Sequence, residues 1–420
     1  MAHESAAPPL QGRVEALVFF TVFLDLVGFG IVMPQLPFYI QLMGGSASTL
    51  GILLGSFAFT QVLAMPLLGK LSDRYGRRPV ILLSLFANAL AMGLFSLATY
   101  LSLLPLLFVS RILAGATSAN ISTCQAALAD VSTRETRARA MGRLGAGIGL
   151  GMVLGPVMGG LLAERAAWLP PLLAGALALL DTIAVMFLLP ETHPPEKRAA
   201  AAAAAAKTGK QSRFAAATSL EALAAVIALF FLVFLAISAM QVALALLAQA
   251  RLGWGQKEVG YIFTIFGGLG LVIQGGLIGP LSKRAGEVNL VIVGALLLAG
   301  GMLGISLAWT ALTLVGSLVL VGTGLGLLQP LIASLASQVA KEGRQGAILG
   351  LAQSTGALAR TVGPVASGAL FSAFGPSAPF ASAATAGLVA ASLGVLLRSM
   401  GVGKRKPASA AGTEQAPSGK

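Results

Sequence analysis

Charged residues are scarce in this chain of 420 residues: they make up 10% of the sequence, whereas 56% of it is hydrophobic. Soluble globular domains carry roughly 25% charged residues. Water therefore cannot be the solvent for most of this chain. Apolar segments long enough to cross a hydrocarbon core, roughly 20 residues each, recur from Ala16 to Leu397 with short interruptions. We expect nearly the whole chain to lie in a membrane.

Cysteine and histidine are almost absent. The single cysteine, Cys124, excludes a disulfide within the chain, and the two histidines, His3 and His193, are too few for a metal cluster. The sequence also has no nucleophile motif, no metal-ligand spacing and no phosphate-binding loop. It therefore argues against an enzyme and against an ATP-driven pump, and it predicts no metal and no cofactor.

Basic residues, by contrast, are in excess, and they give a net charge of +13. Such a charge can indicate nucleic-acid binding, so the placement of the basic residues has to be considered. They gather in alternate loops and at the chain ends, and the exceptions are few: Arg111, Arg165, Arg251, Lys257 and Arg360. This positive-inside pattern places both termini in the cytoplasm and requires an even number of spans. The charge orients the protein and implies no nucleic-acid partner.

Apolar length and breaker residues predict an all-α integral membrane protein with twelve transmembrane helices. The predicted spans are 14–43, 47–68, 79–99, 102–129, 139–163, 170–190, 220–249, 257–281, 288–308, 311–339, 345–373 and 377–398.

The longest polar segment divides these spans six and six. It contains ETHPPEKR, eight alanines and KTGKQSR. We interpret it as a cytoplasmic linker, and the sequence does not decide whether part of it forms a helix at the membrane surface. The tail is basic and then rich in alanine, proline, serine and glycine, a composition typical of disorder. The predicted order is a cytoplasmic N-terminus, a six-helix half, the linker, a second six-helix half and a disordered cytoplasmic tail: 1–13, 14–190, 191–219, 220–398 and 399–420.

Two internal repeats relate the halves. GKLSDRYG at 69–76 matches GPLSKRAG at 279–286 in five of eight positions, at an offset of 210 residues. GPVMGG at 155–160 matches GPVASG at 363–368, at an offset of 208 residues. Two matches at nearly one offset predict two homologous, pseudo-symmetric six-helix halves. Transporters built from parallel repeats of this kind bind substrate near the bilayer midplane, where the halves meet.

The loop GKLSDRYGRRP at 69–79 resembles the signature loop of the major facilitator superfamily. The resemblance implies the major facilitator fold and a latch, in which charges of this loop and an acidic residue ending the fourth span hold the halves in the outward-facing state. A simple anchor among lipid headgroups is the alternative. In the second half Lys283 replaces the aspartate, so we expect a degenerate latch there. The matching latch residues are Gly69, Asp73, Arg74, Gly76, Arg77, Arg78 and Asp130.

The predicted fifth span resembles the glycine-and-proline motif associated with antiporters in this superfamily. Its physical content is a thin, bendable helix that packs at the interface between the halves, and simple close packing is the alternative. The second-half relative Gly363-Pro364 shows that the element occurs twice. The positions that carry the motif are Gly147, Gly151, Gly155 and Pro156.

The first span, LDLVGFGIVMPQLP at 24–37, resembles that of the twelve-span drug:proton antiporters and especially the tetracycline/proton antiporter group. The likeness extends through the first half to Glu191 and is looser in the second. The tetracycline exporters carry an aspartate in the third span and another in the ninth, whereas this chain has Asn88 in the third and no acid in 288–308. Tetracycline itself is therefore doubtful, and a neutral or monocationic amphipathic substrate is expected.

Three ionisable residues lie inside predicted spans and are candidates for proton coupling: Asp25, Arg111 and Asp181. Such residues are costly in a bilayer and usually face a cavity or a partner. Burial disfavours the charged form of a carboxylic acid, so changing water access at Asp25 can load and unload a proton. The resemblance associates Arg111 with proton transfer; it can pair with Asp25 or with an anionic substrate. Structural roles remain the alternative for all three. For Arg360, beside the Gly363-Pro364 element of the predicted eleventh span, we expect a structural contact between the halves.

Neutral polar and aromatic residues within the spans are candidates to line a substrate cavity, although many such residues only hydrogen-bond or pack between helices. The predicted cavity residues are Phe29, Gln61, Asn120, Gln125, Gln241, Gln274, Gln329 and Gln353.

The sequence therefore predicts a secondary active transporter in the cell (inner) membrane, which exports small amphipathic compounds in exchange for protons. Its expected partners are protons, that substrate and the lipid bilayer, and we expect a monomer. A metabolite carrier of the same fold is an alternative. A non-transporting membrane sensor or scaffold is another, but it would have no use for a latch loop and buried charges.

Overall fold

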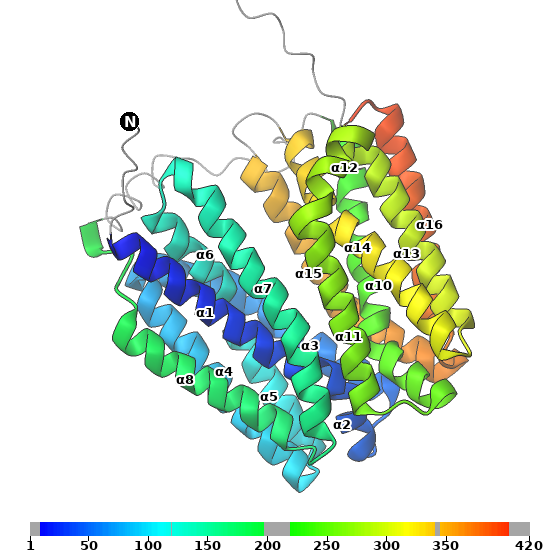
Figure 1. Cartoon of the computed structure of the whole chain (residues 1–420), viewed down its shortest axis with the longest axis horizontal. Coiled ribbons are helices and arrows are strands. Elements are labelled where there is room, and N and C mark those ends of the chain that lie inside the picture. The colour runs from blue at the N-terminus through cyan, green and yellow to red at the C-terminus, as the bar shows by residue number, and fades with distance from the viewer. Residues whose placement is uncertain (1–8, 119, 197–218, 341–344, 403–420) are drawn as a thin grey trace, which may run out of the picture.

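The computed structural model describes residues 9–118, 120–196, 219–340 and 345–402. Within these ranges every regular element is helical, and the helices form two groups that correspond to the two halves of the sequence (Figure 1). The first half consists of α1 (Pro9–Val32), η1 (Met33–Gln35), α2 (Leu36–Leu42), α3 (Ala47–Tyr75), α4 (Arg77–Leu101), α5 (Leu104–Thr117), α6 (Asn120–Val131), α7 (Arg134–Ala163) and α8 (Leu169–Leu188). The second half consists of α10 (Leu220–Leu252), α11 (Gln256–Val272), η3 (Ile273–Leu277), α12 (Ile278–Ala285), α13 (Glu287–Leu307), α14 (Ala311–Val339), α15 (Gln345–Phe374) and α16 (Ala378–Ser399).

These elements make twelve helical spans, and the predicted all-α, twelve-helix architecture is confirmed. Eleven of the helices are long and apolar enough to cross a membrane. The twelfth, α15, is 30 residues long but carries Arg360, Pro364 and several glycines, which lower its hydropathy. Most of the predicted linker, residues 197–218, lies outside the described residues, as do residues 1–8 and the tail from 403 onward.

Three of the predicted spans are interrupted. The first contains the 3-10 turn η1 with Pro34 at its start, because proline lacks the N–H that would continue the α-helical pattern. The fourth is divided into α5 and α6 at Ser118, and the eighth contains the π-helical turn η3 at Gly275 and Gly276. Such turns are frequent at functional sites.

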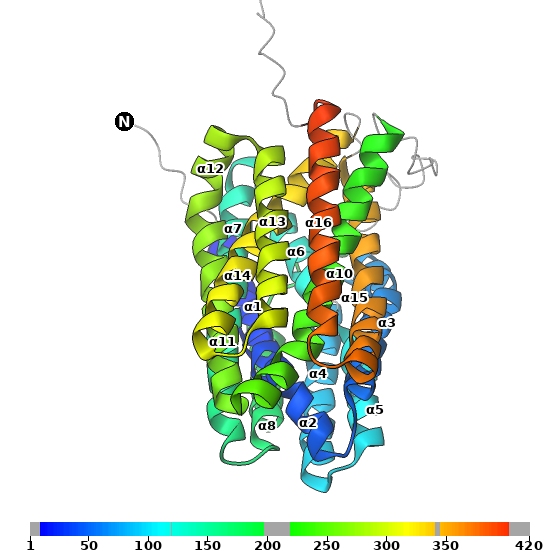
Figure 2. The same ribbon diagram turned by 90° about the vertical axis from the view of Figure 1, so that its right-hand side faces the viewer.

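Within each half the helices pack closely on one another. In the first half, α1 packs on α7 and α8, and α4 packs on α5 and α8. In the second half, α13 and α16 run side by side and α13 also packs on α14 (Figure 2). The main contacts between the halves are made by two pairs, α3 with α15 and α7 with α11.

The halves meet at one end of the bundle and diverge toward the other, where α3 ends and α10, the first helix after the predicted linker, begins (Figure 1). We call these the closed end and the linker end. At the closed end the Ser48 hydroxyl donates to Ser372 Oγ at 2.9 Å. Lys257 lies 3.7 Å from Glu164, and Gln35 Nε2 donates to the Gln256 carbonyl at 3.3 Å.

Small residues allow the two halves to touch at the closed end. A Cβ atom on Gly51 of α3 would collide with the Pro364 carbonyl of α15. A Cβ on Gly260 of α11 would lie 2.5 Å from the Pro156 carbonyl of α7. Both motifs of the second repeat, Gly155-Pro156 and Gly363-Pro364, therefore lie where the halves approach most closely.

The first repeat also has a structural counterpart in each half. Gly76 ends α3 with φ +110° and donates to the Ser72 carbonyl at 3.0 Å, whereas Gly286 ends α12 with φ +79° and donates to the Ser282 carbonyl at 3.1 Å. Glycine adopts positive φ without the strain that a side chain would cause. The same turn therefore joins the second and third spans of each half.

Candidate substrate and proton site

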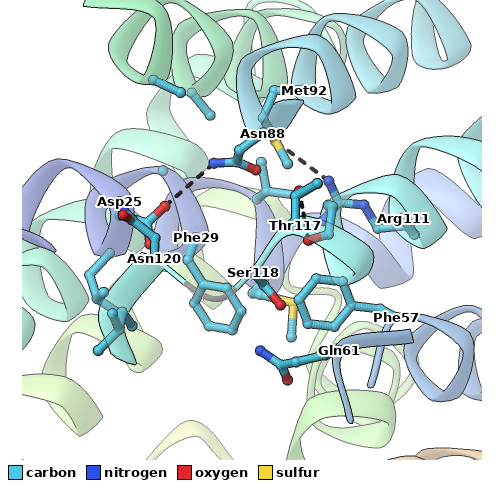
Figure 3. Close-up of a pocket in the computed structure, with 18 of the residues that line it drawn as sticks. Asp25, Phe29, Phe57, Gln61, Asn88, Met92, Arg111, Thr117, Ser118 and Asn120 are labelled. Carbon is cyan, nitrogen blue, oxygen red and sulfur yellow. Dashed lines mark hydrogen bonds between the residues drawn. The ribbon is translucent and has the colours of Figure 1, made fainter. Parts of the chain in front are cut away.

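A pocket of about 260 Å³ lies mainly in the first half and reaches the second (Figure 3). Its walls come from α1, α3, α4, α5, α6 and α8, together with Gln241 of α10 and Arg360 and Pro364 of α15. Most of the lining surface is apolar, and polar and charged side chains lie among it, as in sites for small organic molecules. The three predicted proton-coupling residues, Asp25, Arg111 and Asp181, all line this pocket.

Asp25 lies in the C-terminal half of α1, near the middle of the membrane-spanning segment Gln11–Leu42. The Asn88 amide of α4 donates to its Oδ1 at 3.4 Å, and Asn120 of α6 lies beside it (Figure 3). No ion pair to Asp25 occurs among the described residues. The carboxyl group thus has only neutral neighbours at hydrogen-bonding distance, so it can be held in either protonation state.

Arg111 of α5 is buried, with 4% of its surface exposed. Its guanidinium carbon lies 4.7 Å from the centre of the Phe95 ring, and one nitrogen lies 3.4 Å from the Met92 sulfur. Its Nε has no hydrogen-bond partner within the described residues. The sequence left two partners open for Arg111: Asp25 and an anionic substrate. In the part of the chain that the structure describes, no ion pair joins Arg111 to Asp25 in this conformation.

Asp181 of α8 is 3% exposed. The Thr21 hydroxyl of α1 donates to its Oδ1 at 3.0 Å, and its Oδ2 has no hydrogen-bond partner among the described residues. Asp181 and Asp25 line the same pocket. A peripheral helix thereby contributes a second buried carboxyl group to the same pocket.

Of the eight predicted cavity residues, the structure brings four to this pocket: Phe29, Gln61, Asn120 and Gln241. The other four have exposed side chains and do not line it: Gln125, Gln274, Gln329 and Gln353. A polar residue in a span indicates that some partner is needed, but the sequence does not say which face of the helix is turned inward.

Sequence reasoning missed part of the pocket. Arg360 was interpreted as a structural contact, yet it lines the pocket and its guanidinium carbon lies 4.6 Å from the Phe234 ring centre. Ser84 and Asn88 of α4 also belong to the lining. Ser84, Asn88 and Met92 follow one another at intervals of four residues, and this spacing was the available signal, because residues four apart share one face of a helix.

The latch residues gather at the linker end. Arg77 donates to Asp130 Oδ2 through Nε at 3.0 Å and to Asp73 Oδ1 through Nη1 at 2.6 Å. Arg77 is nearly buried and Asp73 is exposed, so the pair with Asp130 is the better shielded of the two. Within the described residues, Arg77 makes no ion pair with the second half, and the latch role stays a prediction.

The other predicted latch residues surround this pair. Gly76 supplies the turn already described, and Gly69 lies on α3 with open space around it. Arg74 lies over the Tyr75 ring at 5.3 Å, and Arg78 donates to the Met186 carbonyl at 2.5 Å.

Glu191 contacts the predicted latch residues, although the sequence did not assign it to them. Its carboxylate accepts hydrogen bonds from the backbone N–H groups of Arg77 at 2.9 Å and Arg78 at 3.2 Å. It thereby caps the N-terminus of α4, where unpaired N–H groups and the helix dipole favour a negative charge. His193, two residues further on, has its Nδ1 3.5 Å from Asp130.

The glycine-and-proline helix makes two different contacts. The predicted residues Gly147, Gly151 and Gly155 face α1 of their own half, at Phe19, Leu26 and Gly30 respectively. Only Pro156 of the four faces the second half, through its carbonyl at Gly260. The expected interface between halves is therefore carried by one of the four residues, because the i, i+4 spacing of the glycines places them on a single face.

Comparison with known proteins agrees with this architecture. The family model of the Major Facilitator Superfamily matches residues 18–364, which is most of the chain. The chain belongs to the Major Facilitator Superfamily. It is therefore a secondary transporter and not an enzyme, as predicted.

Relatives within the superfamily align with most of the length of this chain. The class C tetracycline resistance protein of Escherichia coli is 32% identical over 359 residues, which covers 84% of this chain and 88% of that protein. Multidrug resistance protein 2 of Bacillus subtilis (strain 168) is 28% identical over 86% of this chain and 89% of its own length. Among solved structures, the human organic anion transporter MFSD10 (TETRAN) has a TM-score of 0.68 and 26% identity, covering 92% of this chain and 100% of that one. The predicted resemblance to tetracycline and drug transporters is confirmed.

Proposed function

We propose that this transporter exports small amphipathic compounds in exchange for protons. The observation that carries the proposal is the pair of carboxyl groups at Asp25 and Asp181, which lie in one pocket and are bonded only to neutral side chains. A buried carboxyl group without a cation partner favours the protonated form. When the pocket opens first to one side of the membrane and then to the other, the two carboxyl groups can take up protons on one side and release them on the other.

The positive-inside pattern supports a cytoplasmic position for the linker end and for both termini. On that orientation the closed end faces outward, and the described conformation opens toward the cytoplasm. Substrate would enter from the cytoplasm or from the inner leaflet of the cell membrane. Rocking of the halves about the pocket would then open the closed end by separating Ser48 from Ser372.

The apolar lining supports an amphipathic substrate. Phe29, Phe57 and Met33 offer contact surface for a small organic molecule in a pocket whose lining surface is mostly apolar. The relatives named for tetracycline and multidrug resistance support export. Asn88, at a position where the resemblance implied an aspartate, supports a substrate other than tetracycline. A metabolite carrier remains the second candidate, favoured by the small volume of the pocket.

Proton flux in everted membrane vesicles tests the proposal. The vesicles carry wild type, Asp25→Asn or Gln353→Ala and are energised to an acid interior. We then add a panel of compounds: lipophilic cations, neutral antibiotics, amphipathic anions and tetracycline. Gln353 is the control because it lies outside the pocket lining. We expect at least one compound to release protons through wild type and through the control, and none through Asp25→Asn. Equal proton release by wild type and Asp25→Asn would contradict the proposal.

A further inference from the structure

Two arginines, one from each half, line the pocket without an acidic partner. Arg111 belongs to α5 and Arg360 to α15, and neither forms an ion pair within the described residues. Guanidinium groups remain protonated in proteins, so both carry a fixed positive charge. Burying such a charge without a counter-ion is costly. An unpaired buried cation in a pocket therefore points to a ligand that supplies the missing anion.

The surroundings of Arg111 hold it in place but leave it incomplete. Stacking on Phe95 at 4.7 Å fixes the plane of the guanidinium and offsets part of its lost hydration. The Met92 sulfur is a weak acceptor. The side chain is 4% exposed, and its Nε has no hydrogen-bond partner among the described residues.

Arg360 is held in the same manner, on the part of the pocket wall that the second half contributes. Its guanidinium carbon lies 4.6 Å from the centre of the Phe234 ring of α10, and the side chain is partly buried one helical turn before Pro364. Stacking again occupies the face of the guanidinium, so the N–H groups at its edge remain available for hydrogen bonds. In the part of the chain that the structure describes, no side chain accepts them.

The carboxyl groups of the pocket do not neutralise these arginines. Asp25 accepts from Asn88, and Asp181 accepts from Thr21. Each carboxyl group thus has a neutral donor of its own. The guanidinium fork matches a planar carboxylate, which it can bind through two parallel hydrogen bonds.

We propose that the substrate is an organic anion, with an apolar body and one acidic group that binds between Arg111 and Arg360. The acidic group would contact both halves, while the apolar body would lie on Phe29, Phe57 and Met33. The proposed organic anion differs from the neutral or monocationic substrate that we expect from the sequence. The sequence shows that acidic residues are few in the spans, but it does not show that the two arginines lack acidic partners. The inference that the anion is transported rests on the proposed function. The inference that the anion binds between the two arginines does not depend on it.

Equilibrium binding of three matched fluorescent probes to the purified protein in lipid nanodiscs tests the inference. Dansylglycine carries a carboxylate, dansylamide is neutral and dansyl-ethylenediamine carries an ammonium group on the same aromatic body. The variants are Arg111→Gln, Arg360→Gln, Arg360→Lys and the control Gln329→Ala, which lies outside the pocket lining. Dansylamide binding and gel-filtration profiles show whether each variant remains folded.

We expect wild type and the control to bind dansylglycine about tenfold or more tightly than either other probe, since one lost charged hydrogen bond corresponds to at least that factor. Each glutamine variant should lose this preference while keeping dansylamide binding, and Arg360→Lys should retain part of it. Preference for the ammonium probe, no saturable dansylglycine binding, or an undiminished carboxylate preference in both glutamine variants would overturn the inference. Anion-selective binding without proton release in vesicles would instead contradict the proposed coupling and leave the anion site standing.

Discussion

Arg77 donates to Asp130 through its Nε at 3.0 Å, and the residues at the matching repeat offsets in the second half, Glu287 and Gln338, form a hydrogen bond of opposite polarity. There the Gln338 amide donates to the Glu287 carboxylate at 2.6 Å, and Ser334 donates to the same oxygen at 2.6 Å. At these positions the second half thus has a hydrogen bond in which Gln338 donates, where the first half has an ion pair. The degenerate latch expected from Lys283 stays a prediction.

Asp130→Asn should therefore destabilise the protein more than Gln338→Ala does. The first change removes a largely buried charge from Arg77, and hydrogen bonds to charged groups contribute about 1.5–3 kcal/mol. The second removes an exposed neutral donor, and Ser334 still binds Glu287. Residual folded protein after heating in detergent, measured by fluorescence-detected gel filtration, compares the two. Equal midpoints would show that the ion pair adds nothing to the stability of this face.

Glu191→Gln should weaken the same region through the helix terminus. The carboxylate accepts from two N–H groups at the start of α4, and loss of such a cap costs about 0.5–2 kcal/mol. Glutamine keeps the size of the side chain but removes its charge and one acceptor. Hydrogen exchange of the first turn of α4 should become faster, with Glu258→Gln at the start of α11 as a control that leaves α4 unchanged. Unchanged exchange in α4 would contradict the capping role.

A disulfide across the closed end should stop transport reversibly. The Oγ atoms of Ser48 and Ser372 lie 2.9 Å apart, so cysteines there lie within reach of a disulfide. Ser48→Cys with Ser372→Cys in a Cys124→Ala background should lose transport on oxidation and regain it with reductant. Each single cysteine variant serves as a control. Full transport by the oxidised double variant would show that the closed end does not have to open.

Gly51→Ala should impair transport, whereas Gly93→Ala should not. A Cβ on Gly51 would collide with the Pro364 carbonyl, so the alanine forces α3 and α15 apart at the closed end. A Cβ on Gly93 meets nothing within 4 Å, and alanine in a helix is favoured over glycine by about 0.8–1.0 kcal/mol. Initial rates of substrate-driven proton release in vesicles, normalised to the amount of protein, compare them. Wild-type rates for Gly51→Ala would contradict the importance of this contact.

The helices could be predicted because a bilayer imposes one length on every span, and the sequence shows apolar length directly. The grouping of residues within a helix could also be predicted, since Ser84, Asn88 and Met92 recur at the helical period and all line the pocket. The relation between helices could not. Arg360 meets Phe234 across 126 residues of sequence, and no local pattern records that contact.

The same limit explains the cavity glutamines. Gln61 and Gln241 face the pocket, whereas Gln274 and Gln329 have the same chemistry in equally apolar helices and do not. What differs is the packing of η3, which contains Gln274, and of α14, which contains Gln329, against their neighbours. The fold follows from length and repeats, but the choice of inward face follows from tertiary packing.

The most direct test distinguishes the coupling of transport to protons from the movement of substrate across the membrane. Purified wild type and Asp25→Asn are placed in proteoliposomes and assayed with a substrate found in the vesicle panel, for two activities: exchange of labelled for unlabelled substrate, and accumulation driven by a proton gradient. We predict that Asp25→Asn retains exchange and loses proton-driven accumulation, because the amide keeps the hydrogen-bonding shape of the side chain but cannot carry a proton. Proton-driven accumulation by Asp25→Asn at the wild-type level would contradict the central claim that protons move through this carboxyl group.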